Sequence, residues 1–174
     1  MSKTKKLVLS AMLLAISIIL SRFISIKTQL LVISLNFIPI MISAIWLGPK
    51  YSTLIAALSD LIGAILFPFG SYFPGFTLSS AITGLIYGLF LYNKTNEERK
   101  DINFIIRLIL SSILTLGIVG LLLTSLWLHI LYGSAFAVII SSRIIAQIIM
   151  LPIQVITIFL LEKALRPIAK KYLY

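Results

Sequence analysis

Long apolar runs, each about as long as a bilayer is thick, set the limits on what this chain can fold into. The chain has 174 residues, of which 60% are hydrophobic and 11% are charged, and its mean hydropathy is +1.11. A soluble domain is about 45–50% apolar and about 25% charged. A helix that crosses a bilayer needs roughly 20 apolar residues. We therefore predict an all-α integral membrane protein with a single transmembrane domain that covers residues 1–174.

Proline, glycine and polar residues between the apolar runs predict where the helices begin and end. Pro39 lies near the start of the second run, and Gly48 and Pro49 form a turn at its end. We expect Pro152 to break the last helix, and residues 93–103 to form a hydrophilic loop. The six expected transmembrane helices cover residues 7–20, 39–48, 51–66, 78–92, 104–128 and 136–165.

Two of the expected loops have unusual sequences. Residues 23–37 are rich in β-branched residues and partly alternate between apolar and polar, which predicts an extended or hairpin-like external loop. Residues 67–77 contain proline, glycine and aromatic residues without any charge, which predicts an apolar loop. The basic start of the chain is similar to that of a signal peptide. No small-residue cleavage site precedes Arg22, however, so we expect the first helix to be retained.

The positive charges indicate how the helices are oriented. The formal net charge is +10, and Lys and Arg residues gather where cytoplasmic segments of membrane proteins collect them. This distribution favours topology and contact with anionic lipid over nucleic-acid binding. We expect both termini and residues 93–103 in the cytoplasm, and residues 23–37, 67–77 and 129–135 outside. The basic residues in these segments are Lys3, Lys5, Lys6, Lys94, Arg99, Lys100, Arg166, Lys170 and Lys171.

Three ionisable residues lie at positions where lipid would be unfavourable, namely Arg22, Asp60 and Arg143. An ionised side chain at the centre of a span costs about 2.5–3.5 kcal/mol on insertion scales, so such residues usually face a cavity or pair with each other. In the expected topology all three can converge on a pocket that opens to the outside. The alternative is a structural Asp–Arg pair that holds the third and sixth helices together.

Two glutamines follow Arg143 on the last helix. Gln147 lies one helical turn further and shares its face, which makes it a candidate ligand contact. An isolated glutamine in a transmembrane helix also forms interhelical hydrogen bonds. Both roles stay open for Gln147, whereas a structural role is favoured for Gln154.

Aromatic side chains form a second group of candidates. Trp127 can stack on a flat ligand or anchor its helix at the membrane interface. Side chains from the uncharged loop can form a wall or lid over such a ligand, or belong to an interfacial aromatic belt. These loop residues are Phe69, Tyr72, Phe73, Pro74 and Phe76.

The residues that catalysis requires are scarce. The chain has no cysteine and one histidine, His129, and it lacks a glycine-rich phosphate-binding loop. We therefore predict no enzyme activity, no ATP hydrolysis, no metal site and no cofactor. A membrane scaffold is an alternative that accounts for the helices and for the small residues Ala11 and Ala15, four positions apart on the first helix. It does not account for the intramembrane charges beside an uncharged aromatic loop.

Taken in order, these segments resemble the substrate-binding (S) components of energy-coupling factor (ECF) transporters, and specifically those for folate. The matching positions span nearly the whole chain. They are residues 20–29, 37–40, 57–64, 72–79, 84–88, 127–128, 131–133, 143–145 and 151–154.

The resemblance implies a multi-pass protein of the bacterial plasma membrane that captures folate from outside. It would deliver folate to a transmembrane coupling subunit and two cytoplasmic ATPase subunits, with Ala11 and Ala15 at the coupling interface. Asp60 would accept the donor edge of the pterin ring, and cations would meet the glutamate carboxylates or the pterin carbonyl. These cations are Arg22, Lys27 and Arg143. A sister S component for riboflavin or thiamine is the nearest alternative.

Overall fold

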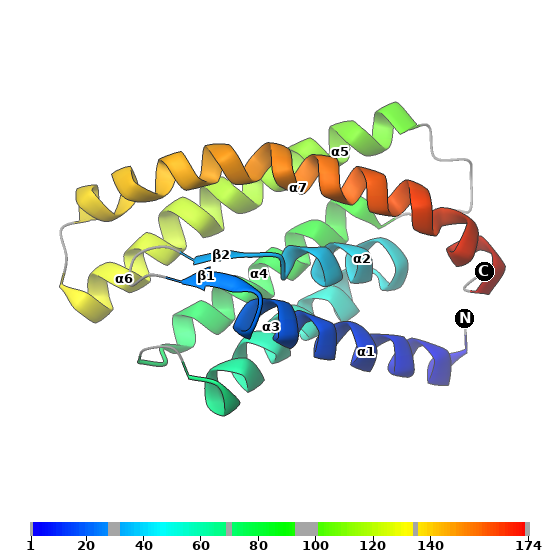
Figure 1. Ribbon diagram of the computed structural model, residues 1–174, viewed down its shortest axis with the longest axis horizontal. Helices are drawn as coiled ribbons and strands as arrows, with labels where there is room; N and C mark the ends of the chain where they lie inside the picture. Colours follow the sequence, from blue (N-terminus) through cyan, green and yellow to red (C-terminus); the bar gives the residue numbers. More distant parts are fainter. Residues whose placement is uncertain (1, 28–31, 69–70, 93–100, 134–135, 173–174) are drawn as a thin grey trace.

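The chain forms six helical rods that lie roughly side by side along one long axis (Figure 1). The computed structural model describes residues 2–27, 32–68, 71–92, 101–133 and 136–172. The elements are α1 (Lys3–Arg22), β1 (Ser25–Lys27), β2 (Val32–Ser34), α2 (Phe37–Leu47), α3 (Pro49–Leu66), α4 (Pro74–Leu91), α5 (Asp101–Leu114), the π-helix η1 (Thr115–Leu123), α6 (Thr124–Tyr132) and α7 (Phe136–Tyr172). Because α5, η1 and α6 follow one another without a break, they make one rod. The predicted six-helix, all-α architecture is confirmed.

The predicted hairpin between the first two helices is also present. Strands β1 and β2 pair antiparallel, with Ile26 opposite Ile33 and Lys27 opposite Val32. Each strand has three residues, and α2 begins at Phe37, shortly after β2 ends. Alternating β-branched residues favour this extended conformation over a helix.

Local capping explains several helix boundaries. Ser2 accepts a hydrogen bond from the Lys5 amide at 3.3 Å and caps α1. Gly48, at a φ of 87°, separates α2 from α3, and Pro49 then occupies the first turn of α3, where its missing N–H leaves no hydrogen bond unmade. Gly133, at a φ of 65°, ends α6 in the left-handed conformation.

Two boundary predictions at prolines were wrong. Pro152 lies inside α7, which continues through it to Tyr172. Neighbouring helices and polar side chains stabilise a proline inside a transmembrane helix, because they compensate for the lost backbone hydrogen bond. Pro74 begins α4, so residues 74–77 of the expected external loop form the first turn of that helix. Proline is favoured there for the reason given for Pro49.

The closest helix pair is formed by α3 and α4. A Cβ atom on Gly84 would overlap the backbone carbonyl of Ser52, and one on Gly88 would overlap the backbone of Pro49. Ser52 donates a hydrogen bond from its hydroxyl to the Gly84 carbonyl oxygen at 2.7 Å. Small residues four positions apart allow this approach, which favours helix association in a membrane.

The outward faces of the rods are apolar. Within the described part of the chain, four helical stretches are long and apolar enough to cross a membrane, and Phe37–Leu47 is a shorter apolar helix. The four stretches are Lys3–Arg22, Pro74–Leu91, Ile102–Tyr132 and Phe136–Pro167. Large exposed side chains such as Leu89, Ile145 and Ile148 face outward, as lipid contact requires. The chain is therefore a multi-pass membrane protein.

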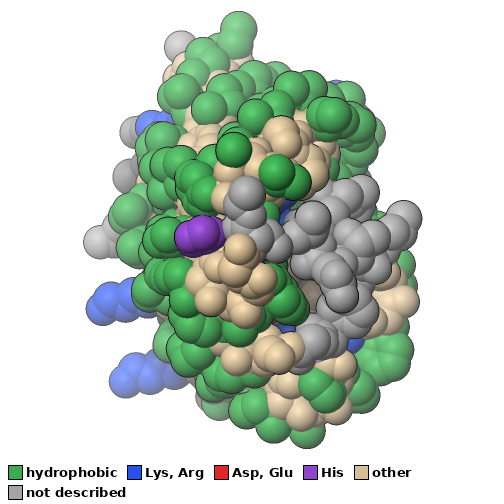
Figure 2. Space-filling view, turned by 90° about the vertical axis from the view of Figure 1, so that its left-hand side faces the viewer, with side chains coloured by type: hydrophobic (Ala, Val, Ile, Leu, Met, Phe, Trp, Pro, Cys, Tyr) green, Lys and Arg blue, Asp and Glu red, His purple; other side chains and the backbone are tan. Residues whose placement is uncertain are grey.

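The connections divide the molecule into two ends. The β1–β2 hairpin, the α3–α4 connection and the α6–α7 connection lie at one end, here called the loop end, and both chain termini lie at the other (Figure 1). Hydrophobic side chains cover most of the described surface of the loop end, and no Asp or Glu of the described residues is visible on this face (Figure 2). The placement of the loop end outside the cell stays a prediction.

Candidate functional site

The intramembrane carboxylate Asp60 lies between α1 and α4, a little under two turns before α3 ends. Arg22, the last residue of α1, places its Nη2 3.7 Å from Asp60 Oδ1 and donates a hydrogen bond from the same nitrogen to the Asp60 backbone oxygen at 3.2 Å. The Arg22 and Asp60 side chains are 13% and 25% exposed, so this ion pair is largely withdrawn from solvent and lipid. Gly63 makes room for it, since a Cβ there would lie 2.6 Å from Arg22 Nε.

Hydroxyl groups occupy the other side of the carboxylate. Thr77, in the first turn of α4, donates a hydrogen bond from Oγ1 to Asp60 Oδ2 at 2.8 Å. The Tyr72 hydroxyl lies 3.1 Å from the same Thr77 oxygen. A short polar chain therefore runs from the exposed segment before α4 to the half-buried carboxylate of α3.

Aromatic rings pack beside this polar chain. Trp127 of α6 donates from Nε1 to the Ser79 hydroxyl at 2.9 Å, and its ring lies 5.5 Å from that of Phe73, centroid to centroid. Phe76 meets Phe73 edge to face at 6.2 Å. Gly75 fits beneath two of these rings, because a Cβ there would lie 2.6 Å from atoms of both Phe73 and Trp127.

A second polar group lies between α7 and the π-helix η1. Arg143 is buried and donates from Nε to the Gly120 carbonyl oxygen at 2.9 Å. Gln147, one turn further, is packed so closely on Gly120 that a Cβ there would lie 2.5 Å from its Nε2. The wide turns of a π-helix are frequent at functional sites. Here the Gly120 carbonyl oxygen of η1 accepts a hydrogen bond from Arg143.

Of the residues predicted from the sequence, Arg22 and Asp60 form one cluster, with Tyr72 linked to it through Thr77. The structural alternative of a pair between the third and sixth helices was wrong in its partner, because Asp60 is paired with an arginine of the first helix. Arg143 and Gln147 share a face as predicted and contact η1. Trp127 packs against Phe73 and Ser79.

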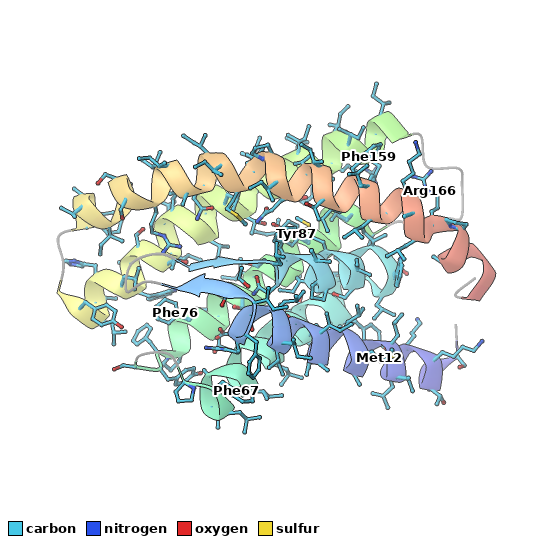
Figure 3. The ribbon with its side chains drawn as sticks, in the orientation of Figure 1. Met12, Phe67, Phe76, Tyr87, Phe159 and Arg166 are labelled. Atoms are coloured by element: carbon cyan, nitrogen blue, oxygen red, sulfur yellow. The ribbon has the colours of Figure 1, made fainter. Side chains whose placement is uncertain are left out.

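The remaining candidates have simpler positions. Gln154 is buried and accepts a hydrogen bond from the Tyr87 hydroxyl at 3.3 Å, which is the structural role favoured for it. Figure 3 shows Tyr87 near the middle of the bundle and Phe76 towards the loop end. Pro74 is exposed at the first turn of α4, and Ala11 and Ala15 are exposed on α1. Phe69 and the side chain of Lys27 lie outside the described residues.

Sequence reasoning missed the residues that hold the candidates in place. Thr77 and Ser79 bind Asp60 and Trp127 by hydrogen bonds, and Gly63, Gly75 and Gly120 leave the space their neighbours occupy. Serine, threonine and glycine are common in transmembrane helices. Only the position of Pro74 at the start of α4 could have indicated that Thr77 lies in a first helical turn.

These features define a class of protein: a multi-pass helical membrane protein with a polar, aromatic-lined site near one end. Among the described residues, no three His, Asp or Glu side chains are grouped as a metal site would require. Residues 1–167 match the family model described as "ECF-type riboflavin transporter, S component". The chain therefore belongs to the S-component family of ECF-type transporters, whose members bind substrate for a transporter and are not enzymes.

Individual relatives and a solved structure have more specific names. A "Folate transporter FolT" of Clostridium novyi is 35% identical over 159 residues, which are 91% of this chain and 88% of the relative. One of Leuconostoc mesenteroides is 38% identical over 167 residues, which are 91% of this chain and 85% of the relative. A solved structure, "Crystal structure of FolT bound with folic acid", matches with a TM-score of 0.82 and 36% identity, and covers 92% of this chain and 94% of that one.

Proposed function

We propose that this S component binds folate at the loop end and delivers it to an ECF transport module for import. The observation that carries the proposal is the full-length similarity to a folic-acid-bound structure, with a TM-score of 0.82 at 36% identity. Two relatives named as folate transporters match over 91% of this chain. The site chemistry supports the same ligand.

The proposed recognition begins at Asp60. A pterin ring has a ring N–H next to an amino group, and this pair of donors matches the two oxygens of a carboxylate. Arg22 and Thr77 already contact the Asp60 carboxylate from two sides, so it is held in one orientation before the ligand arrives. Trp127 and Phe73 offer aromatic faces on which flat pterin and benzoyl rings can stack.

The cationic groups of the site would meet the anionic part of the ligand. Arg143 and Gln147 lie together on the inner face of α7, and Lys27 lies in β1 of the loop end. A guanidinium binds a carboxylate with two parallel hydrogen bonds, which suits the glutamate tail of folate. We propose Arg143 for that tail, supported by Gln147 and Lys27.

Delivery requires a partner surface on the side of the bundle. Ala11 and Ala15 lie on one face of α1 and are both exposed. Small side chains on an exposed helix face let another transmembrane helix approach closely. We propose this face as the contact with a transmembrane coupling subunit, which two cytoplasmic ATPase subunits would drive.

The second candidate ligand is riboflavin, because the matching family model is described as a riboflavin transporter component. Folate is favoured since the printed names of the individual relatives specify it. A titration of the detergent-purified protein with folate, riboflavin and thiamine separates these ligands, with tryptophan fluorescence as the readout. The chain has two tryptophans, so Trp46→Phe leaves Trp127 as the single reporter.

Saturable quenching by folate alone would support the proposal. Saturation by riboflavin or thiamine without a response to folate would overturn the ligand and leave the family intact. If no vitamin binds to protein that melts cooperatively, the proposed binding site itself is wrong.

A further inference from the structure

Thr77 occupies the centre of a hydrogen-bonded chain of three side chains. Its Oγ1 lies 2.8 Å from Asp60 Oδ2 and 3.1 Å from the Tyr72 hydroxyl. The three residues come from α3, from the exposed segment before α4, and from the first turn of α4. One hydroxyl therefore connects a carboxylate in a membrane-spanning helix to a segment at the surface.

The direction of both hydrogen bonds follows from simple counting. An ionised carboxylate only accepts hydrogen bonds, so Thr77 must be the donor to Asp60. A threonine hydroxyl has a single hydrogen, which this bond uses, so Tyr72 must donate to Thr77. The single hydroxyl hydrogen of Tyr72 is then used, and its oxygen can only accept further hydrogen bonds. Hydrogen bonds arranged in such a sequence strengthen one another.

We propose that Thr77 and Tyr72 are positioning residues that hold the Asp60 carboxylate in the orientation that receives the ligand's two adjacent N–H donors. The proposal rests on the function proposed above and specifies how that site selects its ligand. Thr77 occupies one lone pair of Oδ2, and Arg22 faces Oδ1 while it is anchored to the Asp60 backbone. Each carboxylate oxygen has two lone pairs, so Oδ1 and Oδ2 both keep acceptor capacity for a planar heterocycle with two neighbouring donors.

This role differs from the one that the sequence suggested for Tyr72. As a wall or lid, Tyr72 would contact the ligand directly with its ring, and its contribution would not depend on Thr77. As a positioning residue, it contributes through its hydroxyl and only while Thr77 is present to accept the hydrogen bond. The two roles therefore predict different coupling between substitutions.

A double-mutant cycle on folate affinity distinguishes them. Thr77→Val removes the donor to a charged group and should weaken folate binding by about tenfold to a hundredfold, whereas Thr77→Ser should retain most of the affinity. Tyr72→Phe should weaken binding by about twofold to tenfold in the wild-type background. In the Thr77→Val background, Tyr72→Phe should have no further effect. Wild-type affinity in Thr77→Val, or an equal effect of Tyr72→Phe in both backgrounds, would overturn the proposal.

A readout without ligand separates this inference from the proposed function. The chain has no cysteine, so Ser71→Cys, next to Tyr72 and exposed, gives a single reactive thiol. Compared with Ser71→Cys alone, its labelling by a maleimide should become faster by the same factor when Thr77→Val, Tyr72→Phe or both are added, and should be unchanged when Thr77→Ser is added. Unchanged labelling in all variants overturns the hydrogen-bonded chain, even when folate binds normally.

The folate affinities and the thiol labelling rates test the two proposals separately. Faster labelling together with absent folate binding would reject the proposed ligand and keep the link between Tyr72, Thr77 and Asp60. Should Thr77→Val fail to fold, as judged by thermal unfolding, Thr77→Ser and Tyr72→Phe still decide the question. Equal labelling and equal affinity in those two variants would then count against it.

Discussion

At the scale of single residues, the site depends on partners that stabilise the negative charge of one carboxylate inside an apolar helix bundle. Asp60 is a carboxylate in a membrane-spanning helix, where an unpaired charge is unfavourable. Arg22 and Thr77 contact its two oxygens from α1 and α4. Neither partner is near Asp60 in the sequence, so the carboxylate joins three helices at the point proposed for the ligand.

Replacing Asp60 by Asn should reduce the free energy of folate binding more than it reduces the free energy of unfolding. The amide has nearly the same shape, but one of its two groups is a donor that faces the donor edge of the pterin. We expect the dissociation constant for folate to rise about tenfold to a hundredfold, since hydrogen bonds to charged groups contribute about 1.5–3 kcal/mol.

The matched control for Asp60→Asn is Ser59→Ala. Ser59 is buried next to Asp60 on α3 and donates a hydrogen bond to the Ala56 carbonyl oxygen of its own helix. Its removal should leave the affinity unchanged in the same titration. Wild-type affinity in Asp60→Asn would contradict the assigned role of the carboxylate.

A single methyl group at Gly75 should disturb the aromatic side of the site. Gly75→Ala places a Cβ 2.6 Å from atoms of Phe73 and Trp127, so at least one ring must move. Overpacking of this kind costs about 1–3 kcal/mol. We expect a shifted Trp127 emission maximum and weaker folate quenching in the Trp46→Phe background.

Gly117→Ala is the comparison for Gly75→Ala. Gly117 lies in η1, and a Cβ there would meet nothing within 4 Å. Alanine at this position should leave emission and binding unchanged and is expected to favour the helix slightly. Equal effects of the two substitutions would show that the Gly75 contact is not what positions the rings.

At the scale of elements, the α3–α4 pair is the part of the bundle that carries most of the site. Asp60, Thr77 and Ser79 all belong to these two helices. Their close approach depends on glycine, because side chains at Gly84 and Gly88 would overlap the backbone of α3. This packing lies at the start of α3, and it aligns α3 and α4, which hold Asp60 and Thr77 further towards the loop end.

Gly84→Ala should destabilise the protein and weaken binding together. The added methyl group overlaps the Ser52 carbonyl and interferes with the hydrogen bond from the Ser52 hydroxyl to Gly84. A loss of about 1–3 kcal/mol in unfolding free energy is expected from overpacking. Thermal unfolding in detergent measures it, with the exposed neighbour Leu85→Ala as the control. A lower melting temperature for Leu85→Ala than for Gly84→Ala would contradict this assignment.

At the scale of the whole molecule, the two ends of the bundle differ in what they carry. The site lies near the loop end, and both termini lie at the opposite end. Lysine and arginine residues near the termini predict that this opposite end faces the cytoplasm. The site would then open to the outside.

Thiol labelling in intact cells tests that orientation, because the natural chain contains no cysteine. A membrane-impermeant maleimide should label Ser71→Cys but not Ser2→Cys, and cell lysis should make Ser2→Cys reactive. Both positions are exposed, so a difference between them reports the side of the membrane. Labelling of Ser2→Cys before lysis would reverse the predicted topology.

A large side chain on the exposed face of α1 should block folate import without changing folate binding. Ala15→Trp should abolish folate uptake by cells that contain the transport module and leave folate affinity of the purified protein unchanged, because Ala15 is exposed on α1 about two turns before Arg22. Ile145→Trp places the same bulk on a lipid-exposed position of α7 and should retain uptake. Normal uptake in Ala15→Trp would exclude this face as the coupling surface.

The sequence by itself determined the class of the protein, its six helices and its hairpin, because these follow from local properties. The length of an apolar run indicates a membrane span, and alternation of apolar and polar residues indicates a strand. Both patterns can be recognised from the sequence alone. The sequence also marked Asp60, Arg22 and Arg143, since isolated charges in apolar runs are conspicuous. The predictions drawn from two prolines were wrong, because Pro152 is exposed on a helix that continues through it and Pro74 begins α4.

Only the tertiary structure decided which of these residues meet. Arg22 pairs with Asp60 because α1 lies against α3, and Arg143 instead contacts the backbone of η1. Thr77, Ser79 and Gly75 acquire their roles solely from neighbours on other helices. Such contacts depend on distances between rods that are far apart in sequence, and small or hydroxyl-bearing residues carry no periodic signal that could reveal them.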